Sequence, residues 1–198
     1  MIKFINLKQE RPYILFKKHY EKALEANQKN IESISIASYN PITDEVDARY
    51  VNIKMIKENN FIFFTNYNST KSIAFKNHNQ ISALIYWPSI NIQIRMKAKI
   101  KKTEIKFNNE FFRERDIKKN ALAISSEQSK QIKSYEMVQS KYVKILKGAD
   151  LKKCPNYWGG FKFSPYYFEF WKGHESRVNK REVFNNIDGI WKHSFLQP

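Results

Sequence analysis

Apolar and polar residues alternate over residues 91–102 more regularly than anywhere else in the chain. Ile92, Met96 and Ile100 fall on the apolar face, while lysine, arginine and glutamine side chains occupy the other face. A period of two is typical of a β-strand with one buried face. Shorter β-rich runs bounded by turn residues predict further strands. These runs cover residues 33–38, 49–57, 61–65, 81–87, 158–171, 177–184 and 190–193, and the composition of 81–87 predicts a buried strand.

Helical spacing of apolar residues is found in four other segments. It begins over residues 12–27, where Pro12 suits the first helical turn. Ser69 is a suitable N-cap for a short helix that follows the strand at 61–65. Two later helices are predicted over residues 107–115 and 120–147.

This order of elements predicts an α+β protein that is mainly antiparallel β. Five or more such strands with interspersed helices indicate a closed or half-closed barrel with peripheral helices. Because no change of composition divides the chain, we expect a single domain over residues 1–198. The sequence leaves open whether residues 1–11 are flexible.

The composition removes several classes of site. The five glycines form neither a dinucleotide-binding G-x-G-x-x-G motif nor a P-loop. One cysteine and four scattered histidines give no zinc pattern, so we expect no metal. No apolar run approaches membrane-spanning length, and with a single thiol and no export signal the cytoplasm is the expected compartment.

The net charge of +16 is mostly lysine spread along the whole chain, which indicates a solvated coat more than a binding surface. Only seven of the 35 basic residues are arginines. An arginine side chain binds phosphate and carboxylate groups through two parallel hydrogen bonds. The few positions that keep arginine are therefore the more informative ones.

Two segments are candidate anion sites. Arg49 and Lys54 stand at the two ends of a predicted strand, and their odd separation places them on opposite faces unless a bulge intervenes. Taken alone, they are more simply two exposed cations. Thr65 ends the next strand, and Ser69 and Lys71 begin the following helix, whose free N–H groups and dipole favour an anion.

Aromatic and arginine residues gather near the end of the chain. The run Trp158-Gly159-Gly160 is followed by Glu169-Phe170-Trp171 and then by two arginines. Arg177 and Arg181 are four residues apart, so on one strand they would share a face. Two like charges in that arrangement usually require a shared anion or π-system.

As an ordered set these motifs resemble the pyridoxamine 5′-phosphate oxidase family over residues 12–198. The set is R-x-x-x-x-K, F-F-T-N-x-x-S-x-K, W…Q, F-x-x-R…S-x-Q-S, W-G-G-F…E-F-W…R-x-x-x-R…W…L-x-P. No single piece is specific, but their order is. The resemblance implies a homodimeric FMN enzyme with a split β-barrel fold and the cofactor at the subunit interface.

The resemblance also implies which residues bind FMN. Arg49 and Lys71 would hold the FMN phosphate, and Gln93, Trp171 and Arg181 would line the flavin ring. The full implied set is Arg49, Tyr50, Val51, Asn52, Phe64, Thr65, Ser69, Thr70, Lys71, Gln93, Gln128, Ser129, Trp171 and Arg181.

For the substrate, the resemblance implies that Lys54 and Arg115 grip a phosphate group. Arg177, the one residue given a catalytic role, would cover the substrate ring above the flavin. The full implied set is Lys54, Phe111, Arg115, Lys119, Arg177 and Asn179.

Four of these positions depart from the family pattern. Thr70 replaces a second basic residue at the FMN phosphate. On the substrate side, Phe111 replaces a tyrosine, Lys119 falls where a serine is expected, and Asn179 replaces a histidine. The FMN contacts are thus mostly kept, whereas three substrate positions have changed.

The leading hypothesis is an FMN-dependent oxidase that converts pyridoxamine or pyridoxine 5′-phosphate to pyridoxal 5′-phosphate and releases H₂O₂, with no nucleic-acid or membrane partner. One alternative keeps the FMN site but acts on another substrate, such as a reduced phenazine-type ring. A third hypothesis is a lysine-coated nucleic-acid-binding module, which would require exposed aromatic residues for base stacking.

Overall fold

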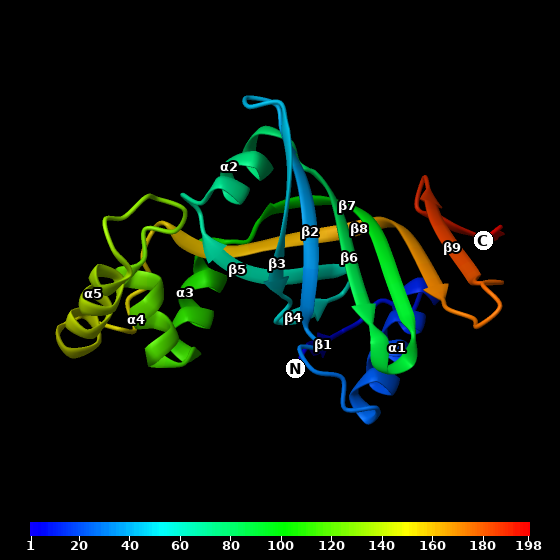
Figure 1. Ribbon diagram of the computed structural model, residues 1–198, viewed down its shortest axis with the longest axis horizontal. Helices are drawn as coiled ribbons and strands as arrows, with labels where there is room; N and C mark the ends of the chain where they lie inside the picture. Colours follow the sequence, from blue (N-terminus) through cyan, green and yellow to red (C-terminus); the bar gives the residue numbers. More distant parts are fainter.

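Ten β-strands form one sheet in the computed structural model, which describes residues 1–198. Five α-helices lie around it (Figure 1). The elements are β1 (Lys3–Ile5), α1 (Arg11–Glu25), β2 (Ser33–Asn40), β3 (Glu45–Asn52), β4 (Met55–Lys57), β5 (Asn60–Asn66), α2 (Thr70–Asn77), β6 (Gln80–Trp87), β7 (Ile92–Lys102), α3 (Ile105–Glu114), α4 (Ile117–Ser125), α5 (Tyr135–Gly148), β8 (Trp158–Lys172), β9 (Lys180–Ile187) and β10 (Ile190–Leu196).

The strand order is β1-β4-β5-β8-β7-β6-β2-β3, and β9 and β10 extend from one end of β8. Every pair is antiparallel except β1 with β4. The long strand β8 pairs with β7 along most of its length, with β5 near Trp158 and with β9 near Trp171. Strand β8 therefore runs from one side of the molecule to the other, and α3, α4 and α5 lie beside its first residues (Figure 1).

The core lies on the inner face of this curved sheet. The alternation over residues 91–102 is confirmed, since Ile92, Ile94 and Met96 are buried and the residues between them are not. Helix α1 covers the core with Phe16, whose ring packs edge-on to that of Phe61 at 5.0 Å. Edge-to-face aromatic pairs of this kind add stability beyond their buried area.

Strand β6 differs from the expected buried strand. Its residues alternate between buried and exposed, and Leu84 and Tyr86 point outward with 36% and 53% of their surface exposed. The composition of the run was misleading because both faces carry apolar residues, although only one face meets the core. The outer face consequently presents apolar side chains to solvent.

Two predicted elements are interrupted. The strand expected over 49–57 is divided into β3 and β4, because the backbone of Lys54 leaves β3 and bonds to Ile62 of β5. The helix expected over 120–147 is two helices joined by residues 126–134. Ser129 has a φ of 75°, which no helix accommodates.

The Trp-Gly-Gly run fastens α3 to the sheet. The backbone N–H of Gly160 donates to Asn108 Oδ1 of α3 at 2.9 Å, and its carbonyl accepts from Tyr67 and Thr103. A Cβ atom on Gly160 would lie 2.5 Å from Thr103 Oγ1, so a side chain does not fit. Close packing is thus sufficient reason for glycine at this position.

Within residues 1–11, Lys3–Ile5 pair with β4 and Ile2 is buried. No helix in the structure is both long enough and apolar enough to span a bilayer.

Candidate functional site

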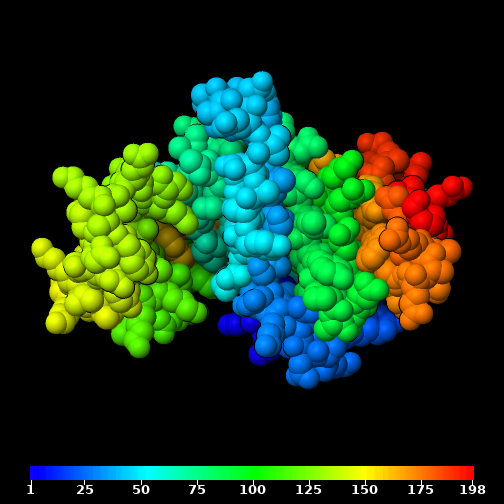
Figure 2. Space-filling view, in the orientation of Figure 1, coloured from blue at the N-terminus to red at the C-terminus, as the bar shows by residue number.

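A cleft of about 390 Å³ opens between β3, β5 and the helical lobe of α3 and α4. The space-filling view shows this lobe standing apart from the central strands (Figure 2). Eleven of the twelve residues that line the cleft were predicted from the sequence; the exception is Asp116. The lining consists of Tyr50, Val51, Asn52, Lys54, Phe64, Thr65, Lys71, Phe111, Arg115, Asp116, Lys119 and Gln128.

Lys71 lies at the floor of the cleft, in the first turn of α2, with 9% of its surface exposed. Its ammonium group donates to Thr65 Oγ1 and Ser69 Oγ at 3.1 Å and to Gln128 Oε1 at 3.3 Å. All three acceptors are neutral. Burial, with a smaller contribution from the nearby charge of Arg49, lowers the pKa of Lys71 to about 8.

A buried ammonium without a carboxylate partner is costly unless an anion completes the site. None of the ion pairs in the structure includes Lys71. The donors around it suit a phosphate, because Thr65, Lys71 and the helix start all offer N–H or O–H groups. Ser69 occupies the predicted N-cap position, but its hydroxyl donates to Asn66 O and caps no N–H group.

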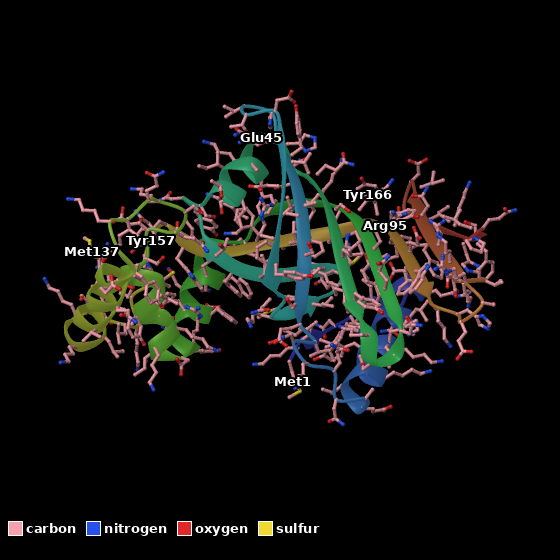
Figure 3. The ribbon with its side chains drawn as sticks, in the orientation of Figure 1. Met1, Glu45, Arg95, Met137, Tyr157 and Tyr166 are labelled. Atoms are coloured by element: carbon pink, nitrogen blue, oxygen red, sulfur yellow. The ribbon has the colours of Figure 1, made fainter.

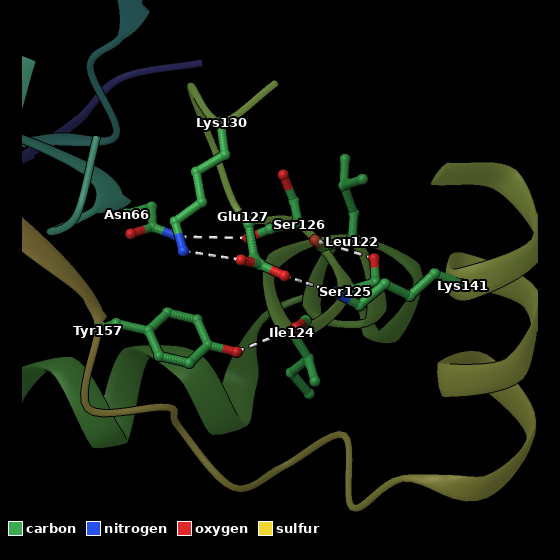
Figure 4. A network of polar contacts seen from close by, with 9 residues as sticks. All are labelled: Asn66, Leu122, Ile124, Ser125, Ser126, Glu127, Lys130, Lys141 and Tyr157. Atoms are coloured by element: carbon green, nitrogen blue, oxygen red, sulfur yellow. Dashed lines mark hydrogen bonds and ion pairs between the residues drawn. The ribbon is translucent and has the colours of Figure 1, made fainter. Parts of the chain in front are cut away.

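The segment between α4 and α5 brings Gln128 to this site. The Asn66 side chain donates to Ser126 O, and Glu127 forms ion pairs with Lys130 and Lys141 (Figure 4). The Tyr157 hydroxyl donates to Ile124 O at the end of α4. Ser129 Oγ lies 3.5 Å from Thr70 Oγ1, so both predicted residues flank the Lys71 pocket.

Arg49 lies beside this pocket on β3. Its guanidinium donates to Ser38 Oγ at 2.7 Å and pairs with the exposed Asp47 at 3.1 Å. Its charge acts on Lys71, whereas Lys54 is under the influence of Lys119 and Arg115. Arg49 and Lys54 thus have different neighbours, but they are not on opposite faces of one regular strand, because β3 ends at Asn52.

The second part of the cleft holds Lys54, Arg115 and Lys119. Burial is the main cause that lowers the pKa of Lys54; the charge of Glu32 opposes this shift, and the charges of Lys119 and Arg115 add to it. Burial likewise lowers the pKa of Arg115. None of the three takes part in an ion pair. Three such cations around one opening favour a second anion.

Aromatic rings form the wall between the cations. Phe111 stacks on Phe64 with the ring centroids 3.8 Å apart, and the Trp158 ring lies nearly parallel to that of Phe64 with the centroids 5.1 Å apart. The guanidinium of Arg115 lies over the Trp158 ring at 5.1 Å. The wall is flat and apolar, and Phe111 brings no hydroxyl to the cleft.

The remaining predicted residues lie at the other end of β8. Gln93, Trp171 and Arg181 stand side by side on β7, β8 and β9. Arg181 Nε donates at 2.8 Å to Glu169, which also accepts from Arg95 and from the hydroxyl of Tyr167. No role for Glu169 was predicted from the sequence, although this residue belongs to the quoted Glu-Phe-Trp motif.

Arg177 is not on a strand, because β9 begins at Lys180. Its φ of 60° places it in a turn, where its carbonyl accepts from Asn179 N. The expectation that Arg177 and Arg181 share a strand face is therefore wrong. The Asn179 side chain accepts from His174 N and closes this loop.

Within one chain the two groups of predicted residues do not meet. Trp158 and Trp171 are separated by roughly 40 Å of extended strand, and the first group lies near Trp158 while the second lies near Trp171. Figure 3 shows the same separation between Tyr157 at one side of the molecule and Arg95 at the other. One protomer alone thus offers the cleft without the Gln93–Trp171–Arg181 row.

Residues 158–198 match the family model described as the pyridoxine 5′-phosphate oxidase C-terminal dimerisation region. A pyridoxine/pyridoxamine 5′-phosphate oxidase of Christiangramia forsetii is 33% identical over 192 residues, which cover 94% of this chain and 88% of the relative. The chain belongs to the pyridoxine/pyridoxamine 5′-phosphate oxidase family. The enzyme of that name from Leptospira interrogans is 28% identical over 190 residues, with the same coverage.

Solved structures agree on the fold of this oxidase family. PhzG from Burkholderia lata 383, solved with tetrahydrophenazine-1-carboxylic acid, superposes with a TM-score of 0.88 at 22% identity, covering 94% of this chain and 92% of PhzG. A pyridoxamine 5′-phosphate oxidase-related, FMN-binding protein from Nostoc punctiforme superposes with a TM-score of 0.73 at 14% identity. The superposition covers 97% of this chain and 98% of the Nostoc protein. The predicted split-barrel fold class is confirmed, and family membership confirms the expected oxidoreductase class with FMN as cofactor.

Proposed function

We propose that this chain is an FMN-dependent oxidase that converts pyridoxamine or pyridoxine 5′-phosphate to pyridoxal 5′-phosphate. The observation that carries the proposal is a pair of cation groups at one cleft: Lys71, with Arg49 beside it, and Lys54 with Arg115. Lys71, Lys54 and Arg115 form no ion pair, Arg49 pairs only with the exposed Asp47, and the stacked rings of Phe64 and Phe111 line the same cleft. Two phosphates and two stacked rings fit that arrangement.

The first group would hold the FMN phosphate. Lys71 and Arg49 supply charge, and Thr65, Gln128 and Ser129 supply polar contacts. FMN bound there would supply an acceptor for the hydride that leaves the substrate C4′ carbon, with O₂ as the final oxidant. The alcohol substrate and O₂ then yield the aldehyde and H₂O₂, and the amine substrate also consumes water and releases ammonia.

The second group would hold the substrate phosphate and so orient the ring. Lys54 and Arg115 are the family positions for this role, and Lys119 adds a third charge in this chain. Anchoring the phosphate fixes the distance and angle at which C4′ meets the flavin. Such positioning supplies much of the rate in a reaction whose chemistry resides in the cofactor.

We further propose that a homodimer completes each site. The Gln93–Trp171–Arg181 row of one protomer would face the cleft of its partner. Arg177 and Asn179, from the loop between β8 and β9, would face it as well. In support, the family model that covers residues 158–198 is a dimerisation region. Exposed Tyr86 pairs directly with Gln93, so the apolar outer face is continuous with this row.

A second candidate is the same FMN site acting on another ring. Phe111, Lys119 and Asn179 replace residues that the family uses for the substrate. The fold neighbour PhzG was solved with a tricyclic carboxylic acid and not with a phosphorylated pyridine. A different substrate for this chain would use the same Lys54 and Arg115 pair to bind a carboxylate.

Purified protein tests these proposals in two steps. A yellow colour with flavin absorbance that is released as FMN supports the cofactor site. Aldehyde and H₂O₂ formed in equal amounts from pyridoxamine 5′-phosphate support the reaction. If neither product forms at saturating FMN, the phosphate substrate is wrong and reduced carboxylated rings are assayed next. A colourless protein that binds DNA in a salt-dependent way would point to the nucleic-acid hypothesis instead.

A further inference from the structure

Asn120, in the second turn of α4, is completely buried. Its side-chain NH₂ donates to Phe112 O at 2.8 Å and to Leu151 O at 2.9 Å. Its side-chain oxygen, Oδ1, accepts a hydrogen bond from Arg115 Nη1 at 3.2 Å. The amide is thus fully used, and it joins the end of α3, the start of α4 and the segment before β8.

Arg115 is held entirely by neutral groups. The same Nη1 donates to Lys119 O at 2.9 Å, and the guanidinium lies over the Trp158 ring. The adjacent carboxylate of Asp116 accepts from Lys119 N at the start of α4 and forms no ion pair with Arg115. Burial lowers the pKa of Arg115 more than Asp116 raises it, so the positive charge is fixed in place without an ion-pair partner.

The arginines at the other end of the sheet are held in the opposite way. Arg181 and Arg95 both bond to the buried carboxylate of Glu169, which offsets their charge. An aspartate in place of Asn120 would do the same to Arg115 and would compete with an incoming anion. A neutral amide fixes the side chain without that competition.

We propose that Asn120 is a positioning residue that holds Arg115 in the cleft so that its free N–H groups meet the anionic group of the substrate. The inference rests on the proposed function, in which Arg115 binds that anion. Asn120 itself does not line the cleft. Its effect on the substrate is exerted through Arg115 alone.

A double-mutant cycle tests this coupling. The Kd of inorganic phosphate is measured by calorimetry on FMN-loaded protein, in which the cofactor's own phosphate fills the Lys71 pocket. Asn120→Ala is expected to raise this Kd about tenfold, as the loss of a bond that orients a charged group does. In an Arg115→Ala background the same substitution is expected to change the Kd less than twofold.

Asn108→Ala is the matched control. Asn108 is also buried on the neighbouring helix α3 and bonds to Tyr67, Thr103 and Gly160, but not to Arg115. It is expected to lower the melting temperature as Asn120→Ala does, while the phosphate Kd stays within twofold of the wild type. With pyridoxamine 5′-phosphate, Asn120→Ala should raise KM and leave kcat nearly unchanged.

Equal losses of phosphate affinity in Asn108→Ala and Asn120→Ala, or an undiminished effect without Arg115, would overturn the proposal. Should Asn120→Ala not fold, Asn120→Ser gives the same test, because its hydroxyl keeps one donor but is too short to hold Arg115. Failure of the proposed function has a different signature: wild-type protein that binds phosphate through Arg115 and Asn120 but does not oxidise pyridoxamine 5′-phosphate.

Discussion

Phe64 and Phe111 stack face to face, with ring centroids 3.8 Å apart and planes 9° apart. The pair places an apolar edge at position 111, where the family pattern has a tyrosine hydroxyl. Phe111→Tyr is therefore expected to add a donor for the substrate phosphate and to lower KM by roughly tenfold, the effect of one hydrogen bond to a charged group. Steady-state kinetics with pyridoxamine 5′-phosphate measures this change.

Phe107→Tyr is the control for that substitution. Phe107 also stacks on Phe64 but does not line the cleft. A KM that falls equally in both variants, or in neither, would show that position 111 does not face the substrate anion.

The pKa of Lys71, about 8, predicts a pH dependence for FMN binding. Below pH 8 the ammonium is charged and ready for the FMN phosphate. Above pH 8 the free protein loses this proton, and binding must restore it, so FMN affinity should fall as pH rises. Fluorescence titrations with FMN at several pH values between 6 and 10 measure this change in affinity. The Lys71→Arg variant should bind FMN with little change in affinity over this pH range. If its affinity falls with pH as steeply as that of the wild type, a group other than Lys71 is responsible.

Arg49 and Arg177 are expected to have separate roles. Arg49→Ala should weaken FMN binding, because Arg49 lies beside the Lys71 pocket. Arg177→Ala should leave FMN affinity unchanged and lower turnover, because its loop lies outside that pocket. Flavin absorbance after gel filtration reports the first effect, and initial rates at saturating FMN report the second. Loss of flavin from Arg177→Ala would contradict this division.

Glu169 predicts a loss of stability in acid. Burial raises the pKa of its carboxyl, but hydrogen bonds from Arg181, Tyr167 and Arg95 outweigh this and hold the pKa below its ordinary value. A carboxylate with a depressed folded-state pKa stabilises the protein above its unfolded-state pKa, and the contribution is lost as pH falls through the folded-state value. Melting temperatures from pH 7 to 3 should therefore fall more steeply in the wild type than in Glu169→Gln. Parallel curves would show that Glu169 contributes nothing to the acid sensitivity.

The close packing around Gly160 predicts that any side chain at this position lowers the stability of the fold. Gly160→Ala would bring Cβ within 2.5 Å of Thr103 Oγ1 and force the α3 attachment to shift. We expect a loss of about 1–3 kcal/mol in the free energy of unfolding, the range for overpacked sites. Gly148→Ala, at the exposed end of α5, has nothing within 4 Å of the new Cβ and serves as control. Urea unfolding of both variants distinguishes crowding from a general sensitivity to glycine loss.

Much of the local structure follows from short-range pattern. The alternation over residues 91–102 identified β7 and its buried face, and the helical spacing near Pro12 identified α1. The pattern failed where a segment has little burial to impose a period. Helix α5 has no fully buried residue, and the loop before it was absorbed into one long helix.

The sequence by itself determined most of the elements, the order of the motifs and through them the family, because the period of apolar residues and the identity of rare arginines are local properties. Only the tertiary structure decided which side chains meet. Gln128 reaches Lys71, Asn120 holds Arg115 and Glu169 offsets Arg181 through bonds across 57, 5 and 12 residues of chain. Even the shortest of these depends on how α3 turns into α4. The pairing of β8 at both of its ends separates the two halves of the site, and no local pattern encodes that distance.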